Sequence, residues 1–309
     1  MICASELSGS RLRSPSSNEY ELLDSIADGG QAEIYGGVCT VSQDPVVVKV
    51  YKDSAGLFPG SGTAESEARY LKMFQNHPNV VCLRDAGPMA VDGVQDGPDI
   101  PALVMEKADR SLAAIMNKET VSPVRAIRLL GQAAVVLDDI HAAGVLHHDA
   151  TPPNMLVTKL PYGERLQLCD FGVATPLHQK TGTVVLGTLT YIAPEYLLAG
   201  RVGSSVDNYA YTVMLYQAFN GGRLPFDIVS EDSTDSKDAL SWVTLHATRG
   251  NDVPEFSETD AVHREIYKMV AAGLRANPAK RPSATAIGQH NELVRAYARG
   301  MAAMPRVFA

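Results

Sequence analysis

The sequence predicts an α+β fold with two lobes, a small β-rich first lobe with one main helix and a larger α-helical second lobe. Between residues 21 and 106, short β-branched runs alternate with turns, which is typical of a sheet. After residue 111, apolar residues recur at helical spacing, and no internal repeat is visible. We therefore expect two lobes with a cleft between them.

The composition is that of an ordinary globular protein. Of the 309 residues, 45% are hydrophobic and 20% are charged, which excludes disorder throughout the chain. The 35 acidic residues outnumber the 27 basic ones and give a formal net charge of −8, so binding to nucleic acid through the overall field is not expected. Four separated cysteines and the lack of a long apolar run predict a soluble, cytoplasmic protein without a membrane span.

The elements of the first lobe can be assigned in chain order. Residues 1–18 are polar and without period, so we expect a flexible N-terminal arm. The run 45–51, PVVVKVY, is the clearest strand, and residues 62–76 have helical spacing. The Gly-, Pro- and Asp-rich stretch 85–101 predicts a loop or hairpin, and a short buried strand is expected at 103–106.

The second lobe begins with a long helix that carries signals at both ends. Ser122 can cap the helix and Pro123 suits its first turn. Gly144 stands where a C-terminal cap belongs. Two further helices are expected over residues 205–219 and 261–275.

Two features of the first lobe suit a ligand that carries phosphate groups. Glycines such as Gly29 and Gly30 let backbone N–H groups approach phosphate oxygens, although most such stretches are plain hairpins. Lys49 ends an apolar strand, and Glu67 on the following helix is a candidate partner. The alternative for Lys49 is a solvated strand end.

The second lobe contributes carboxylate and amide oxygens. Asp149 and Asn154, separated by two prolines, can aim an oxygen acceptor and an amide oxygen into one site. Asp170 follows an apolar strand and is followed by Phe171 and Gly172. A carboxylate in this position suits Mg²⁺, although it could also merely cap a turn.

The order and spacing of these motifs resemble a eukaryotic-type protein kinase domain, from about residue 20 to about residue 293. The matching segments are a glycine-rich loop at 27–34, V-V-V-K at 46–49, H-H-D-A-T-P-P-N at 147–154, D-F-G at 170–172 and A-P-E at 193–195. D-F-G and A-P-E are identical to the family pattern. The resemblance implies the two-lobed kinase fold, with lobes at 19–107 and 108–295 and a C-terminal tail at 296–309.

The resemblance also implies an activity and the residues for it. The chain would transfer the γ-phosphoryl group of ATP, with Mg²⁺, to Ser or Thr hydroxyls of proteins. Asp149 would accept the hydroxyl proton, Lys49 paired with Glu67 would touch the phosphates, and Asn154 and Asp170 would hold Mg²⁺. The other residues expected to contact the nucleotide are Ala27, Gly29, Gly30, Ile34, Met105, Glu106, Ala108, Met155, Leu156 and Cys169.

Several positions would have a structural role. The resemblance makes Met105 the gatekeeper before the hinge, and Asp207 would anchor the catalytic loop. Glu195 and Arg281 would form a buried ion pair. His141, on the apolar face of the long helix, is expected to be a core histidine rather than a metal ligand.

The first lobe departs from the family pattern in two places. Ala27 and Ala32 stand where the glycine loop has two of its glycines, and a positive φ at Ala32 would cost about 1 kcal/mol. Glu67 lies one residue further than usual from the H-P-N-V-V segment, which leaves Glu65 as the fallback partner of Lys49.

The catalytic loop also departs twice. His148 replaces the arginine that clamps an activation-loop phosphate, so we expect activity without phosphorylation of Thr181, Thr183 or Thr190. Thr151 stands in place of the catalytic lysine that contacts the transferred group, which could cost a few kcal/mol of transition-state stabilisation. The alternative function is therefore a pseudokinase scaffold that binds nucleotide or a partner with little or no transfer.

The expected partners are protein substrates with Ser or Thr acceptors, and the oligomeric state is not specified. The segment G-T-L-T-Y at 187–191 resembles the G-T-x-x-Y of serine/threonine kinases. The acidic stretch 227–238 is either a solvated loop or a patch that favours basic peptides. A small-molecule phosphotransferase is disfavoured, because the A-P-E segment at 193–195 serves peptide substrates in the family.

Overall fold

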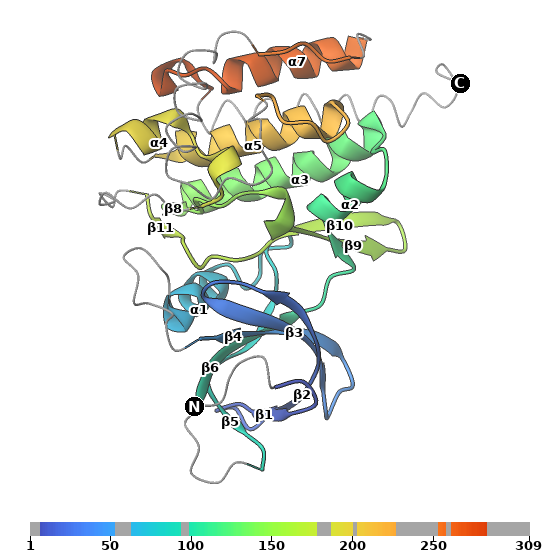
Figure 1. Cartoon of the computed structure of the whole chain (residues 1–309), viewed down its shortest axis with the longest axis vertical. Coiled ribbons are helices and arrows are strands. Elements are labelled where there is room, and N and C mark those ends of the chain that lie inside the picture. The colour runs from blue at the N-terminus through green and yellow to red at the C-terminus, as the bar shows by residue number, and fades with distance from the viewer. Residues whose placement is uncertain are drawn as a thin grey trace. The chain divides into compact units, whose positions relative to one another are not determined.

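The computed structural model of the chain (Figure 1) describes two compact units. The described residues are 7–52, 63–93, 99–177, 187–199, 203–226, 253–257 and 261–282. The first unit ends at Asp109 and also includes Cys169–Ala174, and the second contains Arg110–Leu168 and the chain from Thr175 onward. A β-rich first unit and a helical second unit confirm the predicted fold class.

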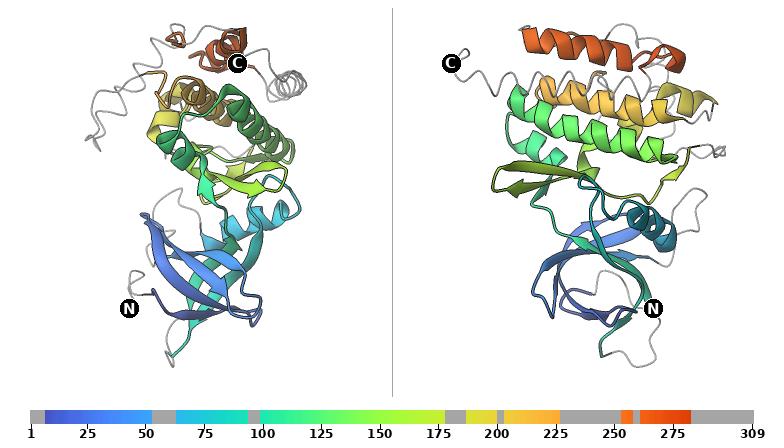
Figure 2. Two further views of the ribbon diagram at one scale, coloured as in Figure 1. Left: turned by 90° about the vertical axis from the view of Figure 1, so that its right-hand side faces the viewer. Right: turned by 180° about the vertical axis from the view of Figure 1, so that it is seen from behind.

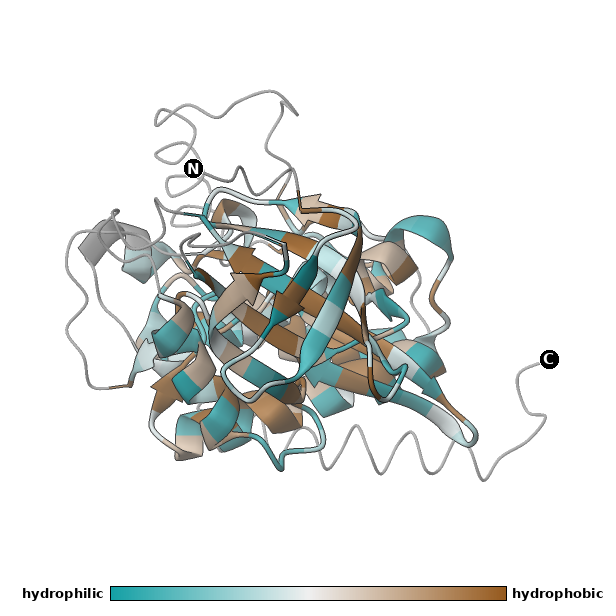
Figure 3. Cartoon of the chain, turned by 90° about the horizontal axis from the view of Figure 1, so that it is seen from below, coloured by the Kyte–Doolittle hydropathy of each residue, from teal (hydrophilic) through white to brown (hydrophobic). Residues whose placement is uncertain are grey.

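The strands described in the first unit form a closed antiparallel barrel in the order β1-β2-β3-β4-β6-β5. They are Arg11–Arg13 (β1), Glu19–Asp28 (β2), Ala32–Cys39 (β3), Pro45–Tyr51 (β4), Leu83–Val91 (β5) and Ile100–Glu106 (β6). The strand predicted at 45–51 is confirmed, and the stretch 85–101 contributes to the β5–β6 hairpin. Polar and apolar residues alternate along several of these strands (Figure 3) because successive side chains point to opposite faces.

The prediction of a flexible arm over residues 1–18 is wrong for residues 7–18. Strand β1 pairs with both β2 and β5, and Leu7 and Leu12 are buried in the barrel core. The buried carboxylate of Asp85 on β5 accepts hydrogen bonds from side chains that precede or begin β2. The polar composition concealed this strand because it has only three residues, of which Leu12 alone is apolar, and one of its two partners, β5, is distant in the sequence. Residues 1–6 lie outside the described part of the chain.

Helix α1 (Ala64–Met73) confirms the helix predicted over 62–76. Its N-terminus is capped by Thr63, whose Oγ1 accepts a hydrogen bond from the backbone N–H of Ser66 at 3.1 Å. Phe171 stacks on the rings of Tyr70 and Phe74, with centroids 6.3 and 5.9 Å away. The short segment around Phe171, which the sequence placed with the second lobe, therefore groups with the first unit.

The second unit contains a stack of helices (Figure 1 and Figure 2). Those in the described part of the chain are α2 (Leu112–Lys118), α3 (Pro123–Ala142), α4 (Pro194–Ala199), α5 (Ser204–Phe219) and α7 (Ala261–Gly273). Helix α5 lies between α3 and α7 and is buried on almost all sides, as its residues are mostly apolar. The helices predicted at 205–219 and 261–275 are confirmed. In the described part of the chain, no helix is both long and apolar enough to span a bilayer.

Short strands and turns accompany the helices of the second unit. Strand β9 (Met155–Leu160) pairs with β10 (Gly163–Leu168) and β7 (Arg110–Ser111), and β8 (Val145–Leu146) pairs with β11 (Thr175–Pro176). Among the residues that the structure describes, 3-10 turns lie at Pro152–Asn154, Leu189–Tyr191 and Pro278–Lys280. These elements carry the polar loops of the second unit.

Helix α3 begins and ends where the sequence signals predict. The Oγ of Ser122 accepts a hydrogen bond from the N–H of Arg125 at 3.4 Å, and Pro123 occupies the first turn. Gly144 follows the C-cap with φ of +79°, a left-handed conformation that favours glycine. The loop that follows β8 is thereby placed directly after a rigid helix.

Three predictions lie outside the described residues. They concern Thr181 and Thr183, the acidic stretch 227–238, and the tail at 296–309.

Candidate active site

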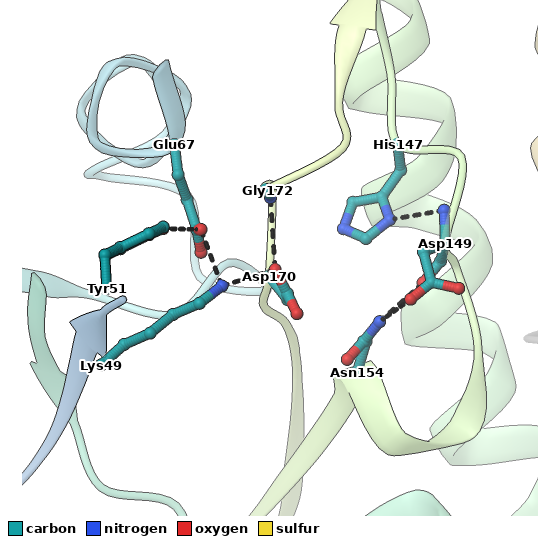
Figure 4. Close-up of polar contacts among 8 residues, drawn as sticks. All are labelled: Lys49, Tyr51, Glu67, His147, Asp149, Asn154, Asp170 and Gly172. Carbon is teal, nitrogen blue, oxygen red and sulfur yellow. Dashed lines mark hydrogen bonds and ion pairs between the residues drawn. The ribbon is translucent and has the colours of Figure 1, made fainter. Parts of the chain in front are cut away.

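Lys49 is buried on β4 between two carboxylates of the first unit (Figure 4). Its Nζ lies 2.8 Å from Glu67 Oε2 and 2.8 Å from Asp170 Oδ1, and the residue is 8% exposed. Burial alone would lower the pKa of Lys49, but the two carboxylates outweigh it and raise that pKa well above its ordinary value. The lysine is therefore a fixed cation, and its interpretation as a solvated strand end is wrong.

Glu67, and not the fallback Glu65, is the partner of Lys49. The side chain of Glu67 is fully buried on α1, whereas Glu65 is exposed and accepts a hydrogen bond from Thr63 Oγ1 at 3.4 Å. Burial disfavours the charged carboxylate and raises the pKa of Glu67, although Lys49 opposes this effect. The hydroxyl of Tyr51 donates to the same Oε2 atom. Sequence reasoning missed Tyr51, although its position two residues after Lys49 places both side chains on one face of the strand.

Asp170 has a backbone conformation that is unusual for a residue other than glycine. Its φ is +61°, and its Oδ1 accepts a hydrogen bond from Gly172 N at 3.2 Å as well as from Lys49. A Cβ added at Gly172 would lie 3.0 Å from Asp170 Oδ1 and 3.2 Å from Glu67 Oε2, so this packing favours glycine. The side chain of Asp170 remains 41% exposed, which leaves carboxylate surface available to a cation.

The glycine turn connects β2 to β3. The N–H of Gly29 donates to the carbonyl oxygen of Ala32 at 3.0 Å, and Ala27 pairs with Ile34 across the two strands. Ala32 is not among the described residues with a left-handed φ, so the strain expected there is absent. Lys52 Nζ reaches the carbonyl oxygen of Gly29 at 2.8 Å and the Oδ1 atom of neighbouring Asp28 at 2.5 Å.

The residues expected to line the adenine pocket belong to both units. Met105 is buried on β6, and the N–H of Glu106 donates to the carbonyl oxygen of Cys82 at 3.0 Å. Cys169 is a half-buried cysteine of the first unit. The remaining expected residues are Ala108 after β6, and Met155 and Leu156 on β9 of the second unit.

Asp149 and Asn154 are joined directly in the second unit (Figure 4). Asn154 Nδ2 donates to Asp149 Oδ2 at 2.7 Å and to the carbonyl oxygen of Asp149 at 2.9 Å. Thr188 donates to Asp149 Oδ1 twice, from its N–H at 2.9 Å and from its hydroxyl at 2.8 Å. The carboxylate of Asp149 is therefore held from both sides. The sequence placed Thr188 in the G-T-x-x-Y segment but did not assign it this contact.

Asp207 at the start of α5 anchors the loop that carries Asp149. Its carboxylate accepts hydrogen bonds from the N–H groups of His147 and His148, both at 2.8 Å. His141 Nε2 lies 2.8 Å from Asp207 Oδ2, as expected of a core histidine. Burial alone would raise the pKa of Asp207, but the bond to His141 and the nearby histidines hold it well below the ordinary value.

His148 is a buried histidine with a left-handed φ of +67°. Its Nε2 lies 2.8 Å from the Oγ1 of Thr175 on β11. Burial lowers the pKa of His148, so the imidazole is neutral at neutral pH and is a poor phosphate ligand. A Cβ on Gly187, whose φ is +102°, would collide with the carbonyl oxygen of His148.

Thr151 does not offer a replacement for the lysine of the family pattern. The residue is 1% exposed, and its Oγ1 is buried without a hydrogen-bond partner among the described residues. A neutral, buried hydroxyl supplies neither a positive charge nor an accessible donor. The placement of Thr151 among the catalytic residues stays a prediction, which this burial does not support.

Glu195 and Arg281 form the buried ion pair that was expected. The guanidinium donates to both carboxylate oxygens, at 2.6 and 2.8 Å, and lies over the ring of Tyr209 at 4.7 Å. This bidentate geometry ties α4 to the segment that follows α7.

Comparison with known proteins finds several bacterial relatives. Serine/threonine-protein kinase pkn2 of Myxococcus xanthus is 33% identical over 218 residues, which cover 67% of this chain and 25% of that protein. Serine/threonine-protein kinase pkn3 of the same organism is 28% identical over 310 residues, or 93% and 52% of the two chains. Serine/threonine-protein kinase PknB of Mycobacterium tuberculosis is 26% identical over 296 residues, or 91% and 43%. The chain thus spans about a quarter to a half of the length of these curated relatives.

The family assignment rests on most of the chain. The model of the protein kinase domain matches residues 20–292. This range includes the Lys49–Glu67 pair, Asp149 with Asn154, and Asp170. The chain therefore belongs to the protein kinase domain family.

Proposed function

We propose that this chain is a protein serine/threonine kinase that transfers the γ-phosphoryl group of ATP, with Mg²⁺, to hydroxyls of protein substrates. One observation supports the proposal most directly, which is the buried Lys49 ammonium held 2.8 Å from both Glu67 and Asp170. A cation fixed in this way costs little reorganisation when phosphate oxygens bind. Lysines are rarely buried in proteins unless they are paired with an acidic side chain. A buried, paired lysine with a strongly shifted pKa is more common at functional sites, so this arrangement favours one.

Asp170 and Asn154 are the residues that would supply oxygen ligands to the metal. The half-exposed carboxylate of Asp170 offers the hard oxygen donors that Mg²⁺ prefers. The amide nitrogen of Asn154 donates to Asp149, so its oxygen is the atom that would bind a cation. The metal, when bound, would neutralise negative charge on the phosphate groups.

Asp149 would act as the acceptor of the substrate hydroxyl proton. The hydrogen bonds from Asn154 and Thr188 fix the orientation of its carboxylate. Because the transition state of phosphoryl transfer is loose, such positioning is expected to supply much of the rate enhancement. The backbone bonds to Asp207 support the same loop from below.

Ser and Thr hydroxyls of proteins are the proposed acceptors. The G-T-L-T-Y segment at 187–191 and the printed names of the relatives support this choice. The acidic stretch 227–238 remains a prediction of a preference for basic peptides. We also propose that the reaction takes place in the cytoplasm, where ATP is available.

A phosphotransfer assay tests the proposal. The purified full chain is incubated with labelled ATP, Mg²⁺ and a generic basic protein substrate, and Asp149→Asn is compared with the matched surface variant Asp139→Asn on α3. We expect Asp149→Asn to lower transfer about 10²- to 10⁴-fold, because a positioned proton acceptor is lost. Asp139→Asn should keep the wild-type rate. Equal signal from the wild type and Asp149→Asn would instead favour the pseudokinase scaffold.

A further inference from the structure

We infer that Tyr51 is a positioning residue that holds the carboxylate of Glu67 toward Lys49 and thereby raises the affinity for Mg-ATP. The part about nucleotide affinity rests on the proposed kinase function. The contact itself does not, because it is a feature of the first unit alone. Neither the family motifs nor the sequence pattern assigned a role to this tyrosine.

The geometry brings two side chains, those of Tyr51 and Lys49, to one carboxylate oxygen of Glu67 (Figure 4). Tyr51 is the last residue of β4 and lies two positions after Lys49, so both side chains project from the same face of the strand. The Tyr51 hydroxyl donates to Glu67 Oε2, which Lys49 Nζ also binds at 2.8 Å. The Tyr51 ring centroid lies 5.4 Å from Lys49 Nζ, within the range of a cation–π contact.

Glu67 depends on these two donors because the rest of its carboxylate is poorly solvated. Its side chain is fully buried, and Oε1 has no hydrogen-bond partner among the described residues. Burial raises the pKa of Glu67, which means that the charged form needs compensation. Burial and the neighbouring Glu67 raise the pKa of Tyr51, so its phenol stays protonated and can donate.

Tyr51 becomes most important when Lys49 also binds phosphate oxygens. The lysine then divides its three donors between the nucleotide and the carboxylates, whereas the phenol still donates to Glu67. Without the hydroxyl, a larger fraction of molecules would have Glu67 turned away from Lys49. The apparent dissociation constant of a ligand rises in proportion as the binding-competent fraction falls.

The isosteric variant Tyr51→Phe removes only the hydroxyl. We expect the KM for ATP to rise about tenfold, the amount that corresponds to a lost hydrogen bond to a charged group, with kcat changed by about twofold or less. Amide hydrogen exchange in α1 should become about tenfold faster, because the helix loses the hydrogen bond between Glu67 and Tyr51 of β4. In a Glu67→Ala background, Tyr51→Phe should have no further effect on the KM.

Tyr20→Phe is the matched control. Tyr20 is also buried in the barrel, and its hydroxyl donates to the Asp85 carboxylate at 3.2 Å. This variant should lower stability but leave the KM for ATP and α1 exchange near their wild-type values. An equal rise of the KM in Tyr20→Phe would overturn the inference, because the effect would then be general destabilisation.

Hydrogen exchange separates a failure of this inference from a failure of the proposed function. If the wild type transfers no phosphate, the kinase proposal fails and α1 exchange still decides the role of Tyr51. Faster exchange confined to Tyr51→Phe supports the positioning role. Unchanged α1 exchange in Tyr51→Phe refutes it, whether or not the protein is active.

Discussion

The Glu195–Arg281 pair offers a test of how a buried charge stabilises the second unit. In Arg281→Met, the carboxylate of Glu195 loses donors at 2.6 and 2.8 Å. The two side chains are only 1% and 7% exposed, so water cannot easily replace the guanidinium. Removing one partner of such a pair costs about 3–5 kcal/mol. We therefore expect the free energy of unfolding of the second unit to fall by about that amount.

A double variant separates the effect of the unpaired Glu195 charge from the effect of the packing contacts that Arg281→Met removes. In Glu195→Gln/Arg281→Met no charge remains at the site, so this protein should be more stable than Arg281→Met alone. Lost stacking on Tyr209 and a lost bond to the carbonyl oxygen of Arg275 should still make it less stable than the wild type.

Urea unfolding followed by circular dichroism, together with hydrogen exchange in α5, measures these changes. Hydrogen exchange assigns the effect to the second unit, since the two units need not unfold together. A loss below about 1 kcal/mol in Arg281→Met would match an exposed pair and contradict the reasoning from burial. A double variant less stable than Arg281→Met would also contradict it.

Three further predictions concern the barrel, the catalytic loop and Asp149. Leu12→Ala should destabilise the first unit by about 2–5 kcal/mol in urea unfolding, because it leaves a cavity at a fully buried site. If Leu12→Ala changed the stability as little as Arg11→Ala at the exposed neighbouring position, residues 7–18 would again have to be interpreted as a flexible arm. The pKa of His148 is lowered from 6.5 on folding, so its contribution to stability is present above about pH 6.5 and is lost as the pH falls. Between pH 7 and pH 5, about the range in which histidine titrates, the urea midpoint of unfolding should therefore drop more steeply in the wild type than in His148→Asn. Asparagine is chosen because it tolerates the left-handed φ of this position. Equal pH dependence in the two proteins would contradict the prediction. Thr188→Ala should lower kcat about tenfold by freeing the carboxylate of Asp149, and an unchanged kcat would show that Asn154 alone suffices.

Local signals in the sequence predicted much of the fold. Ser122 and Pro123 marked the start of α3 and Gly144 its end, because capping depends on the residues of one turn. The apolar run at 45–51 predicted β4, because most of its consecutive residues are apolar and β-branched, which is typical of a buried strand. Strand β1 was missed because Leu12 is its one apolar residue, and the burial of Leu12 depends on pairing with β2 and with the distant strand β5.

The residues of the candidate site were also predicted from the sequence only in part. Lys49, Asp149, Asn154 and Asp170 were predicted as site residues from the order of the motifs, which can be read from the sequence alone. The choice of Glu67 over Glu65 was left open, because two positions along a helix turn a side chain by about 200° and only packing decides which one is buried.

The sequence by itself determined the residue types and their order, and therefore the family and the chemistry they can support. Only the tertiary structure showed that Tyr51 and Lys49 meet at one oxygen of Glu67, that Thr188 holds Asp149, and that Thr151 is buried. The physical reason is that hydrogen bonding and burial depend on distances of a few ångströms between residues that are far apart along the chain. Those distances are set when strands pair and helices pack, and they cannot be predicted from a local pattern in the sequence.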